Sequence, residues 1–300
     1  MSHPPIPPAA SAGRRPTDAE RPGDTGYAYR GLSAQETIAT YFKRLHSIKA
    51  QSTVLLLANL LALIAFIDSG HWALYCVCLV CIPAIAIINR IRIGKLFQGL
   101  TAIVSQDCDV ARYRAVMDAL SARDRFGRSA NTIAIELAYC DYLEFDSRAA
   151  LARLETVSFK RPENFGWYRK LQVEFLSRLD LDDIDGARMT LDRLTAFRQN
   201  FKEGTPNRAA VDAQIADFAV MLRPPSERDA GDAARMRERV ALAMGHQQRA
   251  NWQVYLAEYE LLHGSLDEAE RLASDPALDP LTPRTARLRN EVQAGLEARR

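Results

Sequence analysis

Two uncharged apolar runs near the start of the chain constrain its fold more than any other feature. The first covers residues 50–67, which are 18 positions, and the second covers residues 69–89, which are 21 positions with His71 counted as neutral. At about 1.5 Å per residue, a helix of either length reaches across the roughly 30 Å hydrocarbon layer of a bilayer. The alternative is a buried hairpin of a soluble core, but core helices usually carry charges on their outer side. The runs predict a transmembrane helical hairpin at residues 52–89.

Basic residues flank both runs, whereas the turn between them carries only the acidic Asp68. Because basic residues concentrate on the cytoplasmic side of membrane helices, we expect two spans in the cell membrane with both termini in the cytoplasm. The flanking residues are Lys43, Arg44 and Lys49 before the first run and Arg90, Arg92 and Lys95 after the second.

Two residues inside the runs stand out. The amide of Asn59 can hydrogen-bond to the second span or to another copy, or it can be tolerated without a role, since such bonds contribute only about 1 kcal/mol in membranes. Pro83 is expected to kink the second helix or to interrupt its bonding locally.

The residues before the hairpin divide into two segments. Residues 1–32 are rich in proline and poor in large aliphatic residues, so we expect a disordered tail. Residues 33–51 form one helical stripe that opens with Ser33 and Glu36, the pattern of a capping box. They predict an amphipathic juxtamembrane helix, either on the membrane surface or running straight into the first span.

The charge balance and the cysteines argue against nucleic-acid binding, a disulfide framework and a metal site. From Arg90 onward the chain has 32 basic and 32 acidic residues, so we expect no nucleic-acid partner. The five cysteines are an odd number, which indicates reduced thiols. Cys76, Cys78 and Cys81 have no histidine beside them, so small buried side chains are a better reading than a metal site.

Residues 90–106 continue an apolar stripe and predict a connecting helix, and residues 107–300 carry further stripes with helical spacing. We find no sustained alternation of polar and β-branched residues, so we expect an all-α fold. A step of 37 residues relates three positions, each an acidic residue followed four positions later by Tyr or Ala. We expect the acidic residue to cap the second helix of each helix pair. The acidic residues are Asp109, Asp146 and Asp183.

The segment WQVYLAEYELLHGSLDEAERLA matches the spacing of small and apolar positions in the tetratricopeptide repeat, through Leu256, Ala257, Gly264, Ala269 and Ala273. Residues 107–300 therefore resemble a degenerate repeat of this family, in a membrane protein of bacterial type. Gln253 departs from the pattern, because the family usually has Trp there. The resemblance implies an α-solenoid of antiparallel helix pairs in the cytoplasm, whose concave side binds peptides or proteins.

No catalytic, cofactor or metal site is indicated. Acidic pairs fall at helix ends, where capping explains them, and Cys108 lies between two Asp, which would raise rather than lower its pKa. Trp167, Tyr168 and Arg169 combine aromatic and basic groups, as at protein interfaces, although at a helix start such residues more often lie half in the core and half on a solvated face.

We therefore expect no enzyme but a membrane-anchored helical-repeat scaffold or adaptor for protein–protein interaction at the cytoplasmic face. The alternative is an auxiliary or regulatory subunit of a membrane transport or export complex, recognised through its hairpin. The expected partners are proteins and the lipid bilayer, and a homo-oligomer remains open.

Overall fold

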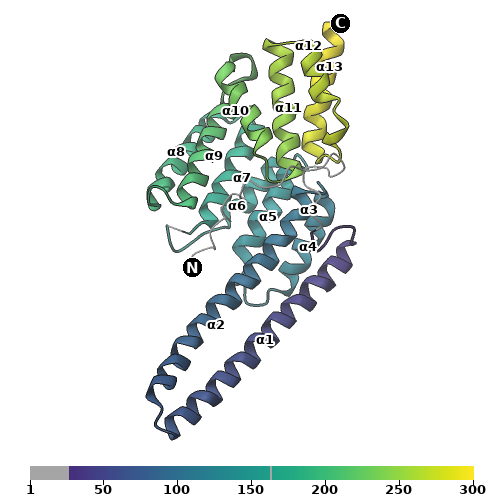
Figure 1. Cartoon of the computed structure of the whole chain (residues 1–300). Helices are drawn as coiled ribbons and strands as arrows, with labels where there is room; N and C mark the ends of the chain where they lie inside the picture. The colour runs from purple at the N-terminus through teal and green to yellow at the C-terminus, as the bar shows by residue number, and fades with distance from the viewer. Residues whose placement is uncertain (1–26, 163) are drawn as a thin grey trace. The chain divides into compact units, whose positions relative to one another are not determined.

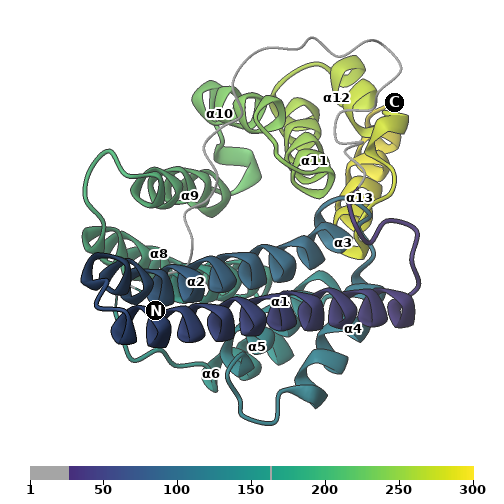
Figure 2. The same cartoon turned by 60° about the horizontal axis from the view of Figure 1, so that its bottom comes forward.

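The computed structural model describes residues 27–162 and 164–300, and within these ranges it contains helices and turns but no strand. The prediction of an all-α chain is therefore confirmed. The residues form two compact units: a hairpin unit, Tyr27–Thr101, and a C-terminal unit, whose described part begins at Ala102. Figures 1 and 2 show the helices of both. Most of the proline-rich segment predicted to be a tail lies outside the described residues.

The hairpin unit consists of α1 (Ala34–Asp68), α2 (Trp72–Gln98) and the short helix η1 (Gly99–Thr101). The predicted capping box is present at the start of α1, where Ser33 Oγ accepts from the Glu36 amide at 3.3 Å and Glu36 Oε2 accepts from the Ser33 amide at 2.8 Å. Since α1 is continuous, the predicted juxtamembrane helix runs straight into the first apolar run.

Both long helices have the length and composition needed to cross a membrane, and only 6% of the most apolar window in each is buried. A core helix of a soluble protein would be mostly covered, so this exposure favours the membrane over the soluble hairpin. Asn59 Nδ2 donates to the carbonyl oxygen of Cys78 at 3.0 Å, which is the predicted bond from the first helix to the second. The second helix passes through Pro83 without ending.

The C-terminal unit is a series of helices in which most consecutive helices pack against each other, as for α5 with α6 and α7 with α8. The helices are α3 (Ala102–Ser105), α4 (Val110–Arg123), α5 (Ala130–Leu143), α6 (Ser147–Glu155), α7 (Gly166–Asp180), α8 (Ile184–Phe197), η2 (Arg198–Asn200), α9 (Pro206–Leu222), η3 (Pro225–Glu227), α10 (Ala230–Ala241), α11 (His246–His263), α12 (Leu266–Ala273), η4 (Pro276–Leu278) and α13 (Pro283–Arg299).

The three acidic residues spaced by 37 are helix caps, as predicted. Asp109, Asp146 and Asp183 are the N-caps of α4, α6 and α8. Each carboxylate accepts a hydrogen bond of 2.9 to 3.0 Å from the backbone amide three residues later. The residue before each cap has a positive φ, between 54° and 68°, so the chain turns in the same way at all three places. These preceding residues are Cys108, Phe145 and Asp182.

A small residue recurs four positions after the cap. Ala150 in α6 and Ala187 in α8 are fully buried. Ala233 in α10 and Ala269 in α12 stand four residues after the N-caps Asp229 and Ser265, and they are 1% and 0% exposed. An alanine at this place lets the neighbouring helix approach closely, because a larger side chain would meet its backbone.

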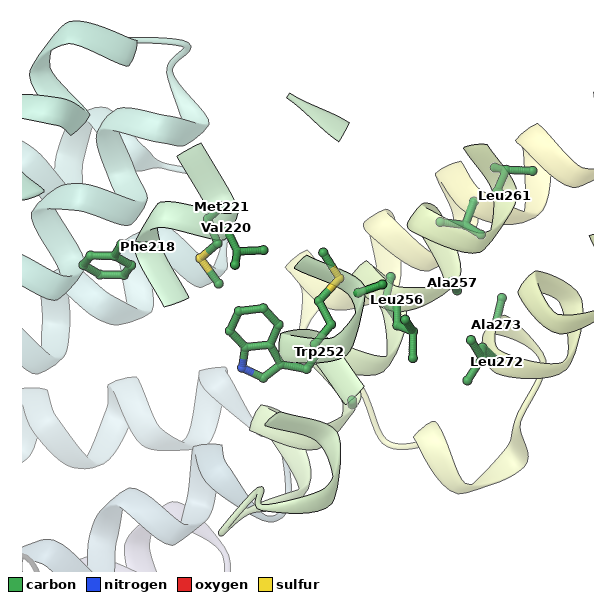
Figure 3. Packing of buried hydrophobic residues seen from close by; sticks show 14 of the residues in the cluster. Phe218, Val220, Met221, Trp252, Leu256, Ala257, Leu261, Leu272 and Ala273 are labelled. Atoms are coloured by element: carbon green, nitrogen blue, oxygen red, sulfur yellow. The ribbon is translucent and has the colours of Figure 1, made fainter. Parts of the chain in front are cut away.

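One connected group of buried apolar residues draws its members from the helices between α7 and α13. Phe175 of α7 and Phe218 of α9 stack with ring centroids 3.7 Å apart. Trp252 of α11 is 4% exposed. Figure 3 shows its indole pointing toward Met221 of α9, while Leu272 lies on the other side of α11. This packing holds the charged side chains described next in fixed positions.

Candidate functional site

The first candidate is the start of α7, where the sequence predicts partner-binding residues. Gly166 lets α7 begin against the preceding loop, since a Cβ there would lie 2.3 Å from the ring of Phe159. Trp167 packs edge-on against this ring, with centroids 5.5 Å apart. Tyr168 stacks on Phe165 at 4.7 Å, and its hydroxyl lies 3.2 Å from Oε1 of Gln214 in α9.

Arg169 points into a charged cluster between α5 and α7. Its guanidinium donates to both oxygens of Glu136, at 3.3 and 3.2 Å, and lies over the ring of Tyr139 at 4.2 Å. Glu136 also accepts from the hydroxyl of Tyr113 at 3.2 Å. Gln172 completes the cluster by accepting from Arg169 at 2.8 Å. All three residues predicted to bind a partner therefore have partners within the C-terminal unit, and their binding role stays a prediction.

The pKa shifts in this cluster follow from burial and pairing. Burial raises the pKa of Tyr113 well above its ordinary range, and the nearby Glu136 carboxylate adds to the effect. Burial works to lower the pKa of Arg169, but the charge and hydrogen bonds of Glu136 together with the nearby Tyr139 and Tyr113 outweigh it, so the net pKa is raised. The cluster is thus a buried ion pair with a neutral phenol hydrogen-bonded to its carboxylate.

A second cluster connects α13 to α5 and α7. Arg284 donates to Oδ1 of Asp180 at 2.5 Å, and its guanidinium lies 4.3 Å from the ring centroid of Tyr142. Asp180 also accepts from the hydroxyl of Ser147 at the start of α6. Burial raises the pKa of Tyr142, although the charge of Arg284 opposes the shift. This contact joins residues 104 positions apart and so ties the end of the chain to the first helix pairs.

A third cluster lies between α9 and α10. Asp217 is 2% exposed, and its two oxygens lie 3.0 Å from Arg235 and 2.8 Å from Arg239. Burial raises the pKa of Asp217 despite both cations. The carboxylate is therefore enclosed by bonded cations, and a general base needs a carboxylate that a substrate can reach.

The thiols are also poor nucleophiles. Burial, with a smaller contribution from Asp107, raises the pKa of Cys108 to about 12. Burial likewise raises the pKa of Cys140 to about 12. The direction predicted for Cys108 from its acidic neighbours is confirmed, but its main cause is desolvation. At neutral pH both thiols stay protonated, whereas nucleophilic attack requires the thiolate.

The histidines of the C-terminal unit bind loop backbone. Nε2 of His246 lies 2.8 Å from the carbonyl oxygens of both Leu278 and Pro280, so this nitrogen carries the proton. Nε2 of His263 lies 2.9 Å from the carbonyl oxygen of Pro225. Within residues 27–162 and 164–300, no three side chains of His, Cys, Asp or Glu are grouped in a way that could hold a metal ion.

The basic residues predicted to flank the spans are all exposed on α1 and α2. Arg92 donates to Oε1 of Gln51 at 2.9 Å, which joins the two helices at the end away from the Gly70 turn. The six residues are Lys43, Arg44, Lys49, Arg90, Arg92 and Lys95.

The sequence analysis identified Arg169 as a candidate residue, but it did not identify the buried carboxylates of the charged clusters. Glu136 and Asp217 stand inside apolar stripes of α5 and α9, next to residues such as Leu137 and Phe218. A carboxylate inside an apolar stripe is the signal that could have found them, because such a group is buried only with a partner.

Comparisons with family models, with curated proteins and with solved structures gave no match to this chain. The function is therefore argued from the geometry alone.

Proposed function

We propose that the chain is a membrane-anchored helical-repeat scaffold, which holds a protein partner at the cytoplasmic face of the membrane. The observation that carries the proposal is the exposure of α1 and α2, whose apolar windows are only 6% buried. Apolar surface of this extent is stable only when lipid or another protein covers it. The basic flanks Lys49 and Arg90 support cytoplasmic termini.

The repeat character of the C-terminal unit supports the scaffold role. The cap and the buried alanine recur in α6, α8 and α10, and α12 keeps the alanine. We propose that these helix pairs form a solenoid similar to tetratricopeptide repeats, since each pair buries its apolar side only against its neighbours. Such stacks offer extended surfaces to proteins. We expect the charged clusters to have a structural role rather than a catalytic one, because their carboxylates and guanidinium groups are paired with one another.

The membrane part is tested by fractionation of the full chain. Membranes carrying the protein are washed with alkaline carbonate, which releases peripheral proteins, and then with detergent. We expect the chain to stay in the pellet until detergent is added. Release by carbonate, or a full chain that is monodisperse in buffer without detergent, would contradict membrane insertion.

The scaffold part is tested by site-specific photo-crosslinking in membranes, with the crosslinker at Met189, which is 67% exposed on α8. We expect one defined protein to be captured from this position and not from a position in the Gly70 turn. A matched chimera replaces residues 52–89 by an unrelated hairpin of equal length. Capture should persist in the chimera, since the C-terminal unit carries the specificity.

The alternative is an auxiliary subunit of a membrane transport or export complex, recognised through its spans. It makes the opposite prediction for the chimera with an unrelated hairpin. The large exposed apolar surface of α1 and α2 favours it, because protein helices could cover that surface as well as lipid. The chimera would then lose the complex. Loss of capture in the chimera, while the chimera remains inserted and folded, would therefore reject the scaffold in favour of this alternative.

A further inference from the structure

The connections between helices in the C-terminal unit are segregated by charge. The turns that follow α3, α5 and α7 contain two acidic residues each and no basic residue. The loops that follow α4, α6 and α8 together contain six basic and three acidic residues. The acidic turns are residues 106–109, 144–146 and 181–183, and the basic loops are residues 124–129, 156–165 and 198–205.

The two sets lie at opposite ends of the helices. The loop 124–129 precedes α5 and the turn 144–146 follows it, and α5 has 14 residues, or about 21 Å of helix. The same holds for the loop before α7 and the turn after it, since α7 has 15 residues. Charge on the helix ends is therefore separated by roughly the length of a helix.

The basic loops are joined to one another. Asn131, at the start of α5, donates to the carbonyl oxygen of Ser158 in the next loop. Asn200 donates to the carbonyl oxygen of Pro162 at 3.4 Å, which links the second loop to the third. We call the exposed basic side chains of this row, together with Phe126, the basic edge; it consists of Arg125, Phe126, Arg128, Lys160, Arg161 and Lys202, and the exposed acidic Glu203 lies beside Lys202.

Phe126 is the exceptional member of the basic edge. Its side chain is 83% exposed, the largest value among the large hydrophobic residues in the described part of the chain. The guanidinium of Arg128 lies 5.4 Å from its ring centroid. Asp124 holds the loop by accepting from the amides of Arg128 at 3.1 Å and Ser129 at 2.6 Å, and Gly127 supplies the positive φ of 62°. An ordered turn therefore presents an aromatic ring and two cations to the outside.

We propose that the basic edge docks on a bilayer surface that contains anionic lipids, with its cations on the lipid phosphates and the ring of Phe126 at the interface. The inference rests on the proposed membrane anchor. Three observations favour lipid. The loops carry a net positive charge, which the anionic cytoplasmic leaflet complements. The exposed ring of Phe126 is an apolar group of the kind that interfacial segments bury at the boundary between headgroups and acyl chains. The tether is the third, since α2 leads into the C-terminal unit and keeps it at high local concentration near the headgroups.

Hydrogen exchange of the full chain in nanodiscs tests the proposal. One set of discs contains phosphatidylcholine alone, and the other contains a mixture rich in phosphatidylglycerol. We expect the backbone amides of residues 121–130 to exchange at least about fivefold more slowly in the anionic discs, because each basic residue near an anionic surface strengthens binding by about fivefold. The acidic turn 181–183 should exchange equally in both.

The test compares two double variants that remove the same charge, R125Q/R128Q in the basic edge and R188Q/R271Q outside it. R125Q/R128Q should abolish the lipid-dependent slowing of exchange. The single variant F126S should reduce the slowing. The control R188Q/R271Q removes two exposed arginines of α8 and α12 outside the basic edge, with side chains 62% and 67% exposed, and should leave the slowing intact.

Equal exchange of residues 121–130 in both kinds of disc would overturn the proposal. So would slowing that a short RNA duplex produces and anionic lipid does not, since the surface would then bind nucleic acid. Failure of the full chain to enter either disc would instead contradict the proposed membrane anchor. The two failures are therefore distinguishable in the same experiment.

Discussion

Replacement of Arg169 by Met tests whether the cluster between α5 and α7 holds the C-terminal unit together. The substitution keeps an unbranched apolar stem and removes the guanidinium cation, so Glu136, whose side chain is 9% exposed, loses its charged partner. Removal of one member of a buried ion pair costs about 3–5 kcal/mol. Because the Arg169 side chain is 30% exposed, water screens part of this interaction, and we expect about 3 kcal/mol.

Glu136→Gln should cost less. The neutral amide still accepts from the hydroxyl of Tyr113, and the partly exposed guanidinium left behind can be hydrated. We expect about 1–2 kcal/mol from the lost charge-assisted bonds. The double variant R169M/E136Q should cost less than the two single variants together, because no unpaired charge remains buried.

The assay is thermal unfolding of the full chain in detergent, followed through the fluorescence of Trp167 and Trp252 in the C-terminal unit. For a unit of this size about 1 kcal/mol shifts Tm by about 2–4 °C, so R169M should lower Tm by roughly 6–12 °C. The matched control is R188M, which breaks the exposed pair of Arg188 with Asp185 and should change stability by less than about 1 kcal/mol. If R169M leaves Tm where the control does, the cluster does not stabilise the fold. If the two single effects simply add, Arg169 and Glu136 are not energetically coupled, and the argument from an unpaired buried charge is wrong.

Three further predictions concern the helix pairs and the thiols. Ala187→Leu, at the fully buried position of α8, should lower the free energy of unfolding by about 1–3 kcal/mol through overpacking. Ala196→Leu, on the exposed side of the same helix, should be nearly neutral. Equal urea midpoints for the two variants would contradict close packing around Ala187. Asp146→Ala removes the N-cap of α6 and should cost about 1 kcal/mol, with Asp146→Asn or Asp146→Ser restoring most of the loss; no rescue would argue against capping. Cys108 and Cys140 should resist iodoacetamide at pH 8 in the folded chain and react in denaturant. A pKa of about 12 lowers the thiolate fraction about a thousandfold relative to an ordinary thiol. Rapid labelling of the folded chain, read by mass spectrometry, would contradict this.

The local features of this fold could be predicted from the sequence because their causes are local. A helix cap needs only a carboxylate and an amide three residues later, so the spacing of Asp109, Asp146 and Asp183 was sufficient to identify three helix starts. The hairpin followed from the length of two uncharged runs for the same reason. The bond from Asn59 to the carbonyl of Cys78 was one of several alternatives, and the antiparallel packing of α1 on α2 decided between them.

The charged clusters could not be predicted because their causes are distant in sequence. Helical spacing identifies the inner face of α7, but it does not say which helix that face meets. The partners of Arg169 and Asp180 lie 33 and 104 positions away along the chain. An exposed aromatic and basic surface and a buried ion pair have the same sequence pattern at this position, so the pattern at Trp167 and Tyr168 left both readings open.

In the proposed solenoid, these clusters would also determine which helix pair stands next to which. Apolar stripes and buried alanines recur every 37 residues in the first pairs, so a stack displaced by one pair would bury nearly the same apolar surface. The ion pair does not recur, because residue 173, one step after Glu136, is Val and residue 132, one step before Arg169, is Thr. A displaced stack would therefore bury Glu136 without a cation, at a cost of several kcal/mol. If the proposed solenoid is correct, the buried charges add little net stability to the native stack but make the displaced stack unfavourable, and this would select a single order of the helices.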